Sequence, residues 1–314
     1  MKVQVLAALI LGAALVAIFI QSGAAASIPI LNNKTQSATQ SPASKTVSAS
    51  APQVVPAVDL AEPSRTAAGA AGKLPACGVN VQYSTDLAWN FGSKQQRGWV
   101  IYIPLINHLI GTESGVGTDE FARSLSRWQS AKGLSASGIL DQDTWETMVH
   151  LMQSERIKDR QYPPADRLVT VSSNEFWDQS RPAELRQVER DTYCAYTRMM
   201  AAAAAEPSLH LSTGAGEHYL KIISAFRPRE YQDQLRQQSP AADRSALAVN
   251  SPHFTGRALD LYVGGDPVST KDPNRMIQTS TPVYRWLVQN AGKFGFKPYF
   301  YEPWHWEYTG PAHY

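Results

Sequence analysis

Four residues in the last quarter of the chain have the chemistry of a catalytic metal site. His253 precedes Asp260 by seven residues, and Glu302 precedes His305 by three. Two imidazoles and one carboxylate can supply three protein ligands to zinc and leave a fourth position for water, a pattern that separates catalytic zinc from structural zinc. Glu302 is then spare, and we expect it to serve as a general base.

Strand geometry explains why each of these pairs is interrupted. Side chains alternate along a strand, so residues separated by an odd number point to opposite faces. Gly256 can turn the chain inside the first pair, and Pro303 restricts the backbone inside the second. We therefore predict that Asp260 faces away from the core side of its strand. His305 should share one strand face with Glu307.

Arg227 lies upstream, at the exit of another predicted strand. The segment 219–224 has the composition of a short strand, and Pro228 suits the first position of a helix expected over 229–238. Arg227 would then project from a strand-to-helix corner. A guanidinium in that position can bind a ligand carboxylate or an oxyanion.

Together these motifs resemble the zinc D,D-peptidases of bacterial cell walls. That family includes the vancomycin-resistance D,D-carboxypeptidases and the D-alanyl-D-alanine dipeptidases. The resemblance is carried by S-x-H-x-x-G-x-A-x-D from Ser251, by E-P-W-H from Glu302 and by S-x-x-R from Ser224, and it covers roughly residues 165 to 310. The departures are mild, with Phe226 where a tyrosine is common and Pro228 where a serine is common.

The resemblance implies one Zn²⁺ per chain and a role for each of the polar residues. The three zinc ligands would be His253, Asp260 and His305. Glu302 would be the catalytic base, and Arg227 would contact the substrate and help to stabilise the oxyanion. We also expect Ser251, the first residue of its motif, to bind substrate.

Hydrolysis of peptidoglycan stem peptides is the activity that the resemblance implies. D-alanyl-D-alanine carboxypeptidase activity is favoured, although a D,D-dipeptidase or an endopeptidase would use the same residues. A non-haem iron oxygenase is an alternative, because two histidines and a carboxylate also form the iron facial triad. It would lack the usual His-x-Asp spacing and would leave Glu302 without a role. A wall-binding protein with a vestigial metal site is a third hypothesis. The presence of all three expected ligands, of Glu302 and of Arg227 counts against it.

The start of the chain indicates export. The positive Met1–Lys2 precedes an uncharged apolar run over 5–20, and Ala24–Ala26 offers a small-residue cleavage site. Residues 1–26 are therefore a predicted signal peptide, or an uncleaved membrane anchor. The protein would be in the periplasm or cell envelope, either soluble or anchored. Residues 27–73 are rich in Ala, Ser, Thr and Pro, which predicts a disordered linker.

Residues 74–160 are predicted to form a small all-helical module. A first helix carries three apolar residues on one stripe, Phe121, Leu125 and Trp128. Gly133 would end this helix, and Asp141 would cap the next. The segment resembles the small peptidoglycan-binding domain of many wall hydrolases. A helical packing module without glycan affinity is the alternative.

Residues 165–314 are then the catalytic domain, of α+β class. We expect a small, mostly antiparallel sheet that carries the zinc site, flanked by helices that include a long one over 184–205. The 29 basic and 27 acidic residues give a net charge of +2, and no basic run suggests nucleic acid. Two cysteines in an exported protein, Cys77 and Cys194, suggest one disulfide. Oligomeric state has no signal in the sequence.

Overall fold

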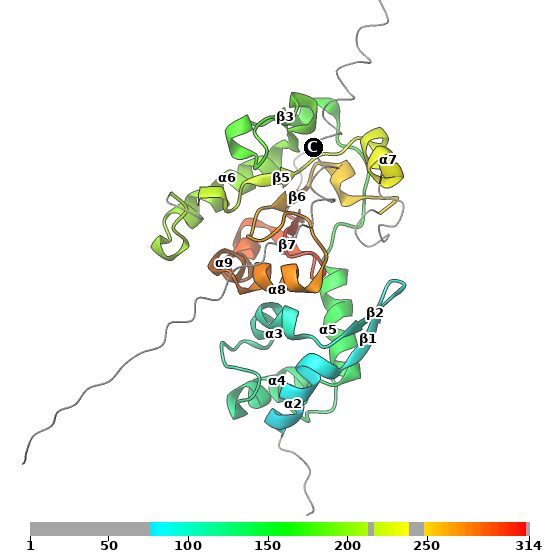
Figure 1. Cartoon of the computed structure of the whole chain (residues 1–314), viewed down its shortest axis with the longest axis vertical. Coiled ribbons are helices and arrows are strands. Elements are labelled where there is room, and N and C mark those ends of the chain that lie inside the picture. The colour runs from blue at the N-terminus through cyan, green and yellow to red at the C-terminus, as the bar shows by residue number, and fades with distance from the viewer. Residues whose placement is uncertain (1–75, 213–216, 239–247, 312–314) are drawn as a thin grey trace, which may run out of the picture. The chain divides into compact units, whose positions relative to one another are not determined.

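The computed structural model describes residues 76–212, 217–238 and 248–311 (Figure 1). The predicted signal peptide or anchor over 1–26 and the predicted linker over 27–73 lie outside these residues. Residues 74–314 form one compact unit by their contacts. Within the described ranges, no helix combines the length and the apolar character needed to cross a membrane.

A four-stranded antiparallel sheet lies at the centre of the C-terminal part, which confirms the α+β class. Its strand order is β5-β6-β8-β7. The strands are β5 (Ile222–Ser224), β6 (Ala258–Leu261), β8 (His305–Tyr308) and β7 (Phe296–Pro298). Ser224 pairs with Asp260, and Asp260 pairs in turn with His305. The register therefore brings three segments that are distant in sequence to one point.

The helices of this part are α6 (Arg190–Ala204), α7 (Arg229–Gln238), α8 (Asp272–Ser280) and α9 (Pro282–Asn290). The prediction of a helix over 229–238 is confirmed. The long helix expected from residue 184 begins instead at Arg190, because the Glu189 side chain accepts a hydrogen bond from Thr192 N and caps it. A second antiparallel pair precedes it, formed by β3 (Leu168–Thr170) and β4 (Gln187–Glu189).

Short 3-10 helices connect many of these elements. They are η1 (Val100–Tyr102), η2 (Ala165–Arg167), η3 (Ser173–Glu175), η4 (Ala183–Leu185), η5 (Pro207–Leu209), η7 (Pro252–Thr255) and η8 (Ala291–Phe294). Of these, η7 contributes directly to the candidate site, because it contains His253.

The N-terminal module consists of α2 (Ala76–Asp86), α3 (Ile103–Ile110), α4 (Asp119–Ala131) and α5 (Gln142–Ser154). Gly133 has a φ of 72° just after α4, and Asp141 caps α5 by accepting from Thr144 N at 3.0 Å, as predicted. The module also contains a hairpin of β1 (Ala88–Phe91) and β2 (Lys94–Arg97). It is therefore mostly helical, not all-helical. The signal for the hairpin was the Gly92-Ser93 turn, in which Gly92 has a φ of 60°.

An aromatic cluster joins the module to the segment that precedes Glu302. Ring centroids of Trp89, Tyr102 and Trp145 lie 6.3, 5.4 and 6.4 Å from that of Phe300. All four side chains are buried. The division into domains at 160–165 stays a prediction, but the two parts share one apolar core.

Cys77 in α2 and Cys194 in α6 are both free cysteines. The disulfide suggested by the sequence is therefore absent from the structure. Cys194 lies on the exposed side of α6, where its thiol faces solvent and not another buried element.

Candidate metal centre

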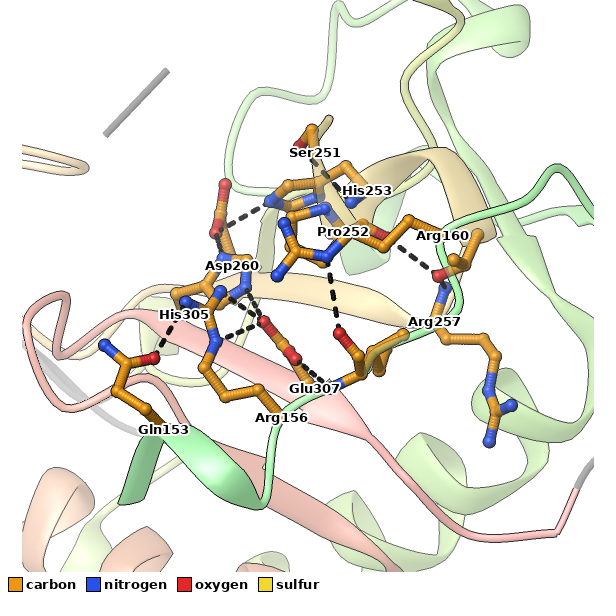
Figure 2. Close-up of polar contacts among 12 residues, drawn as sticks. Gln153, Arg156, Arg160, Ser251, Pro252, His253, Arg257, Asp260, His305 and Glu307 are labelled. Carbon is orange, nitrogen blue, oxygen red and sulfur yellow. Dashed lines mark hydrogen bonds and ion pairs between the residues drawn. The ribbon is translucent and has the colours of Figure 1, made fainter. Parts of the chain in front are cut away.

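Three potential ligands meet on the central sheet (Figure 2). The ligand atoms of His253, Asp260 and His305 all lie within 4.8 Å of one another. Asp260 Oδ1 is 3.3 Å from His253 Nε2 and 2.9 Å from His305 Nδ1. All three side chains are buried. In the described part of the chain, no other group of three His, Cys, Asp or Glu residues is arranged to hold a metal.

A single turn of 3-10 helix, η7, positions His253. Ser251 caps this turn, because its Oγ accepts from His253 N at 3.3 Å. Gly256 ends the turn with a φ of 65°, and a Cβ at Gly256 would lie 3.0 Å from a backbone nitrogen of β4. Glycine has no Cβ, so it adopts this positive φ and allows this close approach at a low cost in free energy. His253 Nδ1 lies 2.7 Å from Ala225 O, which directs Nε2 toward Asp260.

His305 lies between two carboxylates. Its Nδ1 faces Asp260, and its Nε2 is 3.1 Å from Glu307 Oε1. The predicted shared face of His305 and Glu307 is thus confirmed. Glu307 is completely buried and forms an ion pair with Arg156, a residue of the segment after α5. The sequence interpretation did not include Glu307 or Arg156 in the site, and the strand parity of Glu307 was the one available signal.

Arg227 occupies the predicted corner after β5, and its guanidinium faces Asp260. Its Nη2 pairs with Asp260 Oδ2, its Nε donates to Ser224 Oγ at 2.8 Å, and its Nη1 donates to Gln232 Oε1 at 3.3 Å. An arginine has more N–H donors than these three contacts use. Arg227 therefore holds Asp260 in place and keeps donors that can reach a further acceptor.

Glu302 lies in the turn before β8. Its backbone N donates to Tyr299 O at 3.1 Å, and its carbonyl accepts from His305 N at 2.9 Å. Among the described residues, its buried carboxylate has no hydrogen-bond or ion-pair partner. Burial raises the pKa of Glu302 to about 8. A carboxylate with a pKa near the working pH is well suited to accept and return a proton.

The remaining groups divide into neutral and charged forms near neutral pH. Burial, together with the nearby Arg227, lowers the pKa of His253 to about 4. Burial alone would lower the pKa of His305, but hydrogen bonds to Asp260 and Glu307 raise it to about 9. His253 and Arg227 hold the pKa of Asp260 well below its usual value, despite its burial. These shifts favour a neutral His253 beside a charged His305 and a charged Asp260.

The donor set fits a zinc ion. Zinc binds imidazole nitrogen and carboxylate oxygen at about 2.0–2.2 Å, so tetrahedral donors lie about 3.4 Å apart. The two distances from Asp260 Oδ1 to the histidine nitrogens, 3.3 and 2.9 Å, are close to that spacing. The ring nitrogens that face Asp260 are Nε2 of His253 and Nδ1 of His305, and these are the two that would coordinate.

The metal-free protein should lose stability as pH rises from 6.5 toward 9. Glu302 and His305 have folded-state pKa values of about 8 and 9, above their ordinary values of 4.5 and 6.5. Each binds its proton more tightly in the folded chain, so its stabilisation is present at low pH and is lost as pH rises through the folded value. Thermal unfolding of EDTA-treated protein should therefore show a falling Tm across this range. His253 acts in the opposite sense, but between pH 4 and 6.5.

The Glu302→Gln variant is the control for that pH dependence. Glutamine does not titrate, so the decline in Tm between pH 6.5 and 8 should become shallower. A Tm of the parent protein that stayed constant over this range would contradict the assigned pKa shifts.

Residues 186–311 match the VanY family model, which is described as D-alanyl-D-alanine carboxypeptidase. A solved structure, described as the LdcB LD-carboxypeptidase and as revealing the molecular basis of peptidoglycan recognition, is 24% identical to this chain. The match covers 48% of this chain and 72% of that chain, with a TM-score of 0.34. No curated protein matches this chain. The family match includes all of the predicted site residues, Arg227, Ser251, His253, Asp260, Glu302 and His305.

Proposed function

We propose that this protein is a zinc-dependent D-alanyl-D-alanine carboxypeptidase that acts on peptidoglycan stem peptides. The proposal is supported by the match of residues 186–311 to the VanY family of carboxypeptidases. The observation that carries the proposal is the convergence of His253, Asp260 and His305 close to the buried carboxylate of Glu302. One Zn²⁺ would be held by these three ligands. A substrate of this class would place the protein in the periplasm or cell envelope.

Glu302 would carry the proton transfers of the hydrolysis. When bound, zinc is a Lewis acid that polarises carbonyl groups and lowers the pKa of water. Glu302 would accept a proton from the attacking water as the new C–O bond forms. It would then pass that proton to the amine of the departing D-alanine as the C–N bond breaks.

Arg227 and Ser251 would orient the substrate. The donors of Arg227 that are not used by Asp260, Ser224 or Gln232 would bind a carboxylate or the developing oxyanion, and charge-assisted bonds of this kind are strong. Ser251 Oγ accepts a bond within η7, so its hydroxyl proton would be donated to the substrate.

The proposal is tested by incubating the zinc-loaded protein with purified muropeptides and analysing the products by mass spectrometry. Loss of a single terminal alanine from pentapeptide stems is the expected result. Loss of a dipeptide, or cleavage of a cross-link, would identify a dipeptidase or an endopeptidase instead. Metal analysis of the same sample should give one zinc per chain. Stoichiometric iron would instead favour the hypothesis that the protein is a non-haem iron oxygenase.

The roles of the chain before the catalytic part are also proposals. Residues 1–26 are proposed as a signal peptide or anchor, and 27–73 as a linker. Residues 74–160 are proposed as a peptidoglycan-binding-like module. Their expected effect is to hold the catalytic part close to the wall.

A further inference from the structure

The segment that leaves α5 contacts the catalytic part beside both candidate histidine ligands (Figure 2). We define it as the connecting segment, residues 155–164. On the His305 side, Arg156 binds Glu307. On the His253 side, Arg160 Nη1 donates to Asn250 O at 2.6 Å. The Tyr162 ring stacks on Phe254, the residue after His253, with centroids 5.7 Å apart.

Arg156 is held on several sides. Its Nε and Nη2 both donate to Glu307 Oε1, at 2.8 and 2.5 Å, and its Nη1 donates to Gln153 Oε1 at 3.3 Å. Its guanidinium carbon lies 3.7 Å from the centroid of the Tyr299 ring. The next residue, Ile157, donates its backbone N–H to Glu307 Oε2 at 2.7 Å. Both carboxylate oxygens of Glu307 are therefore engaged by the connecting segment.

Burial separates this ion pair from ordinary surface pairs. The Arg156 side chain is 14% exposed and that of Glu307 is 0% exposed. Removing one partner of a buried pair leaves an uncompensated charge in the interior, which is strongly unfavourable. Arg156 is thus the permanently charged partner of Glu307, whereas the neighbouring His305 is charged only when protonated.

Glu307 in turn contacts His305 on the side opposite to Asp260. A histidine that binds a metal through one ring nitrogen usually donates its other N–H to a carboxylate, which fixes the tautomer and the ring orientation. Glu307 Oε1, 3.1 Å from His305 Nε2, is placed to accept that bond and leave Nδ1 for the metal.

We infer that Arg156 and the Ile157 N–H position His305 through Glu307, so that the connecting segment completes the proposed metal centre and does not only link the two parts of the chain. Arg156 lies outside the VanY-matching residues 186–311, so this contribution comes from the other part of the chain. The inference rests on the proposed zinc site. Arg156 is a positioning residue, since it reaches the metal ligand only through Glu307.

A second ion pair provides a matched control. Glu155 Oε2 lies 3.1 Å from Lys297 Nζ, with side chains 45% and 36% exposed. This pair joins the same end of α5 to β7 but is solvent-exposed. Exposed pairs of this kind contribute little to stability. The Glu155→Gln variant therefore tests whether any loss of contact between module and sheet has the same effect.

The experiment compares the full chain with its Arg156→Met, Arg156→Lys, Glu307→Gln and Glu155→Gln variants. Zinc affinity is measured by competition with a chromophoric chelator, and kcat and KM with a D-alanyl-D-alanine-terminated peptide. Arg156→Met and Glu307→Gln should each weaken zinc affinity by about 10-fold to 100-fold, the usual effect of losing a partner of a ligating histidine. The kcat should fall with KM little changed. Arg156→Lys should recover part of the affinity, and Glu155→Gln should match the parent.

The measured zinc affinities either support or overturn the inference. Parental zinc affinity in folded Arg156→Met and Glu307→Gln would overturn the inference, and so would an equal loss in Glu155→Gln. If Arg156→Met does not fold, the nearly isosteric Glu307→Gln variant decides alone. A parent protein that binds no zinc would instead refute the proposed function, on which the inference rests.

Discussion

The Glu302→Gln variant should lose about 100-fold to 10,000-fold in kcat while it binds zinc as tightly as the parent. General acid–base catalysis by a positioned side chain contributes on that order. Glutamine keeps the size of the side chain but cannot accept a proton at neutral pH. Glu302 is not one of the three clustered ligands, so the metal affinity should be preserved. Steady-state kinetics on a stem peptide, with zinc content measured on the same sample, test both parts.

A Glu302→Asp variant serves as the control for this prediction. It retains a carboxylate in a more withdrawn position, so its kcat should lie between those of the parent and Glu302→Gln. If zinc-loaded Glu302→Gln turned over substrate at the parental rate, another group would have to be the base.

Asp260→Asn should cause the largest loss of metal. Asp260 supplies the one anionic donor of the cluster, and it lies between the two histidines. Zinc affinity should fall by more than the ~10-fold to 100-fold that outer-shell partners cost, because a coordinating group itself is altered. Activity should fall with it. Arg227 would face a neutral amide, so a lower Tm of the metal-free protein is also expected.

Asp272→Asn provides the comparison for Asp260→Asn. Asp272 also pairs with an arginine, Arg275, but its side chain is 64% exposed and it is not part of the cluster. Zinc stoichiometry and activity of this variant should match those of the parent. EDTA should abolish the parental activity, and added zinc should restore it. Tight zinc binding by Asp260→Asn would contradict the assigned ligand set.

Much of the candidate site could be predicted because its determinants are local. Gly256 permits a positive φ and Pro303 fixes its own φ whatever surrounds them, so both breaks in the strand pattern could be located from the sequence. Strand parity placed His305 and Glu307 on one face, and their side chains are in contact in the structure. Family resemblance then assigned expected roles that local geometry alone does not define.

Other features depended on contacts that no local pattern contains. Helix α6 starts at Arg190 because Glu189 caps it and residues 187–189 pair with β3, which helix propensity alone did not indicate. Arg227 faces Asp260 because β5 and β6 pair with Ser224 opposite Asp260. The two cysteines are free, although their number and the predicted export suggested a bond.

The sequence by itself thus determined the candidate metal-ligand types and the backbone breaks between them, since each follows from residues a few positions apart. Tertiary structure alone decided what surrounds them. Arg156 and Glu307 are 151 residues apart, and they pair because the end of α5 packs beside β8. A buried charge selects its partner from whatever the fold brings near it, and that choice appears only when the chain is folded.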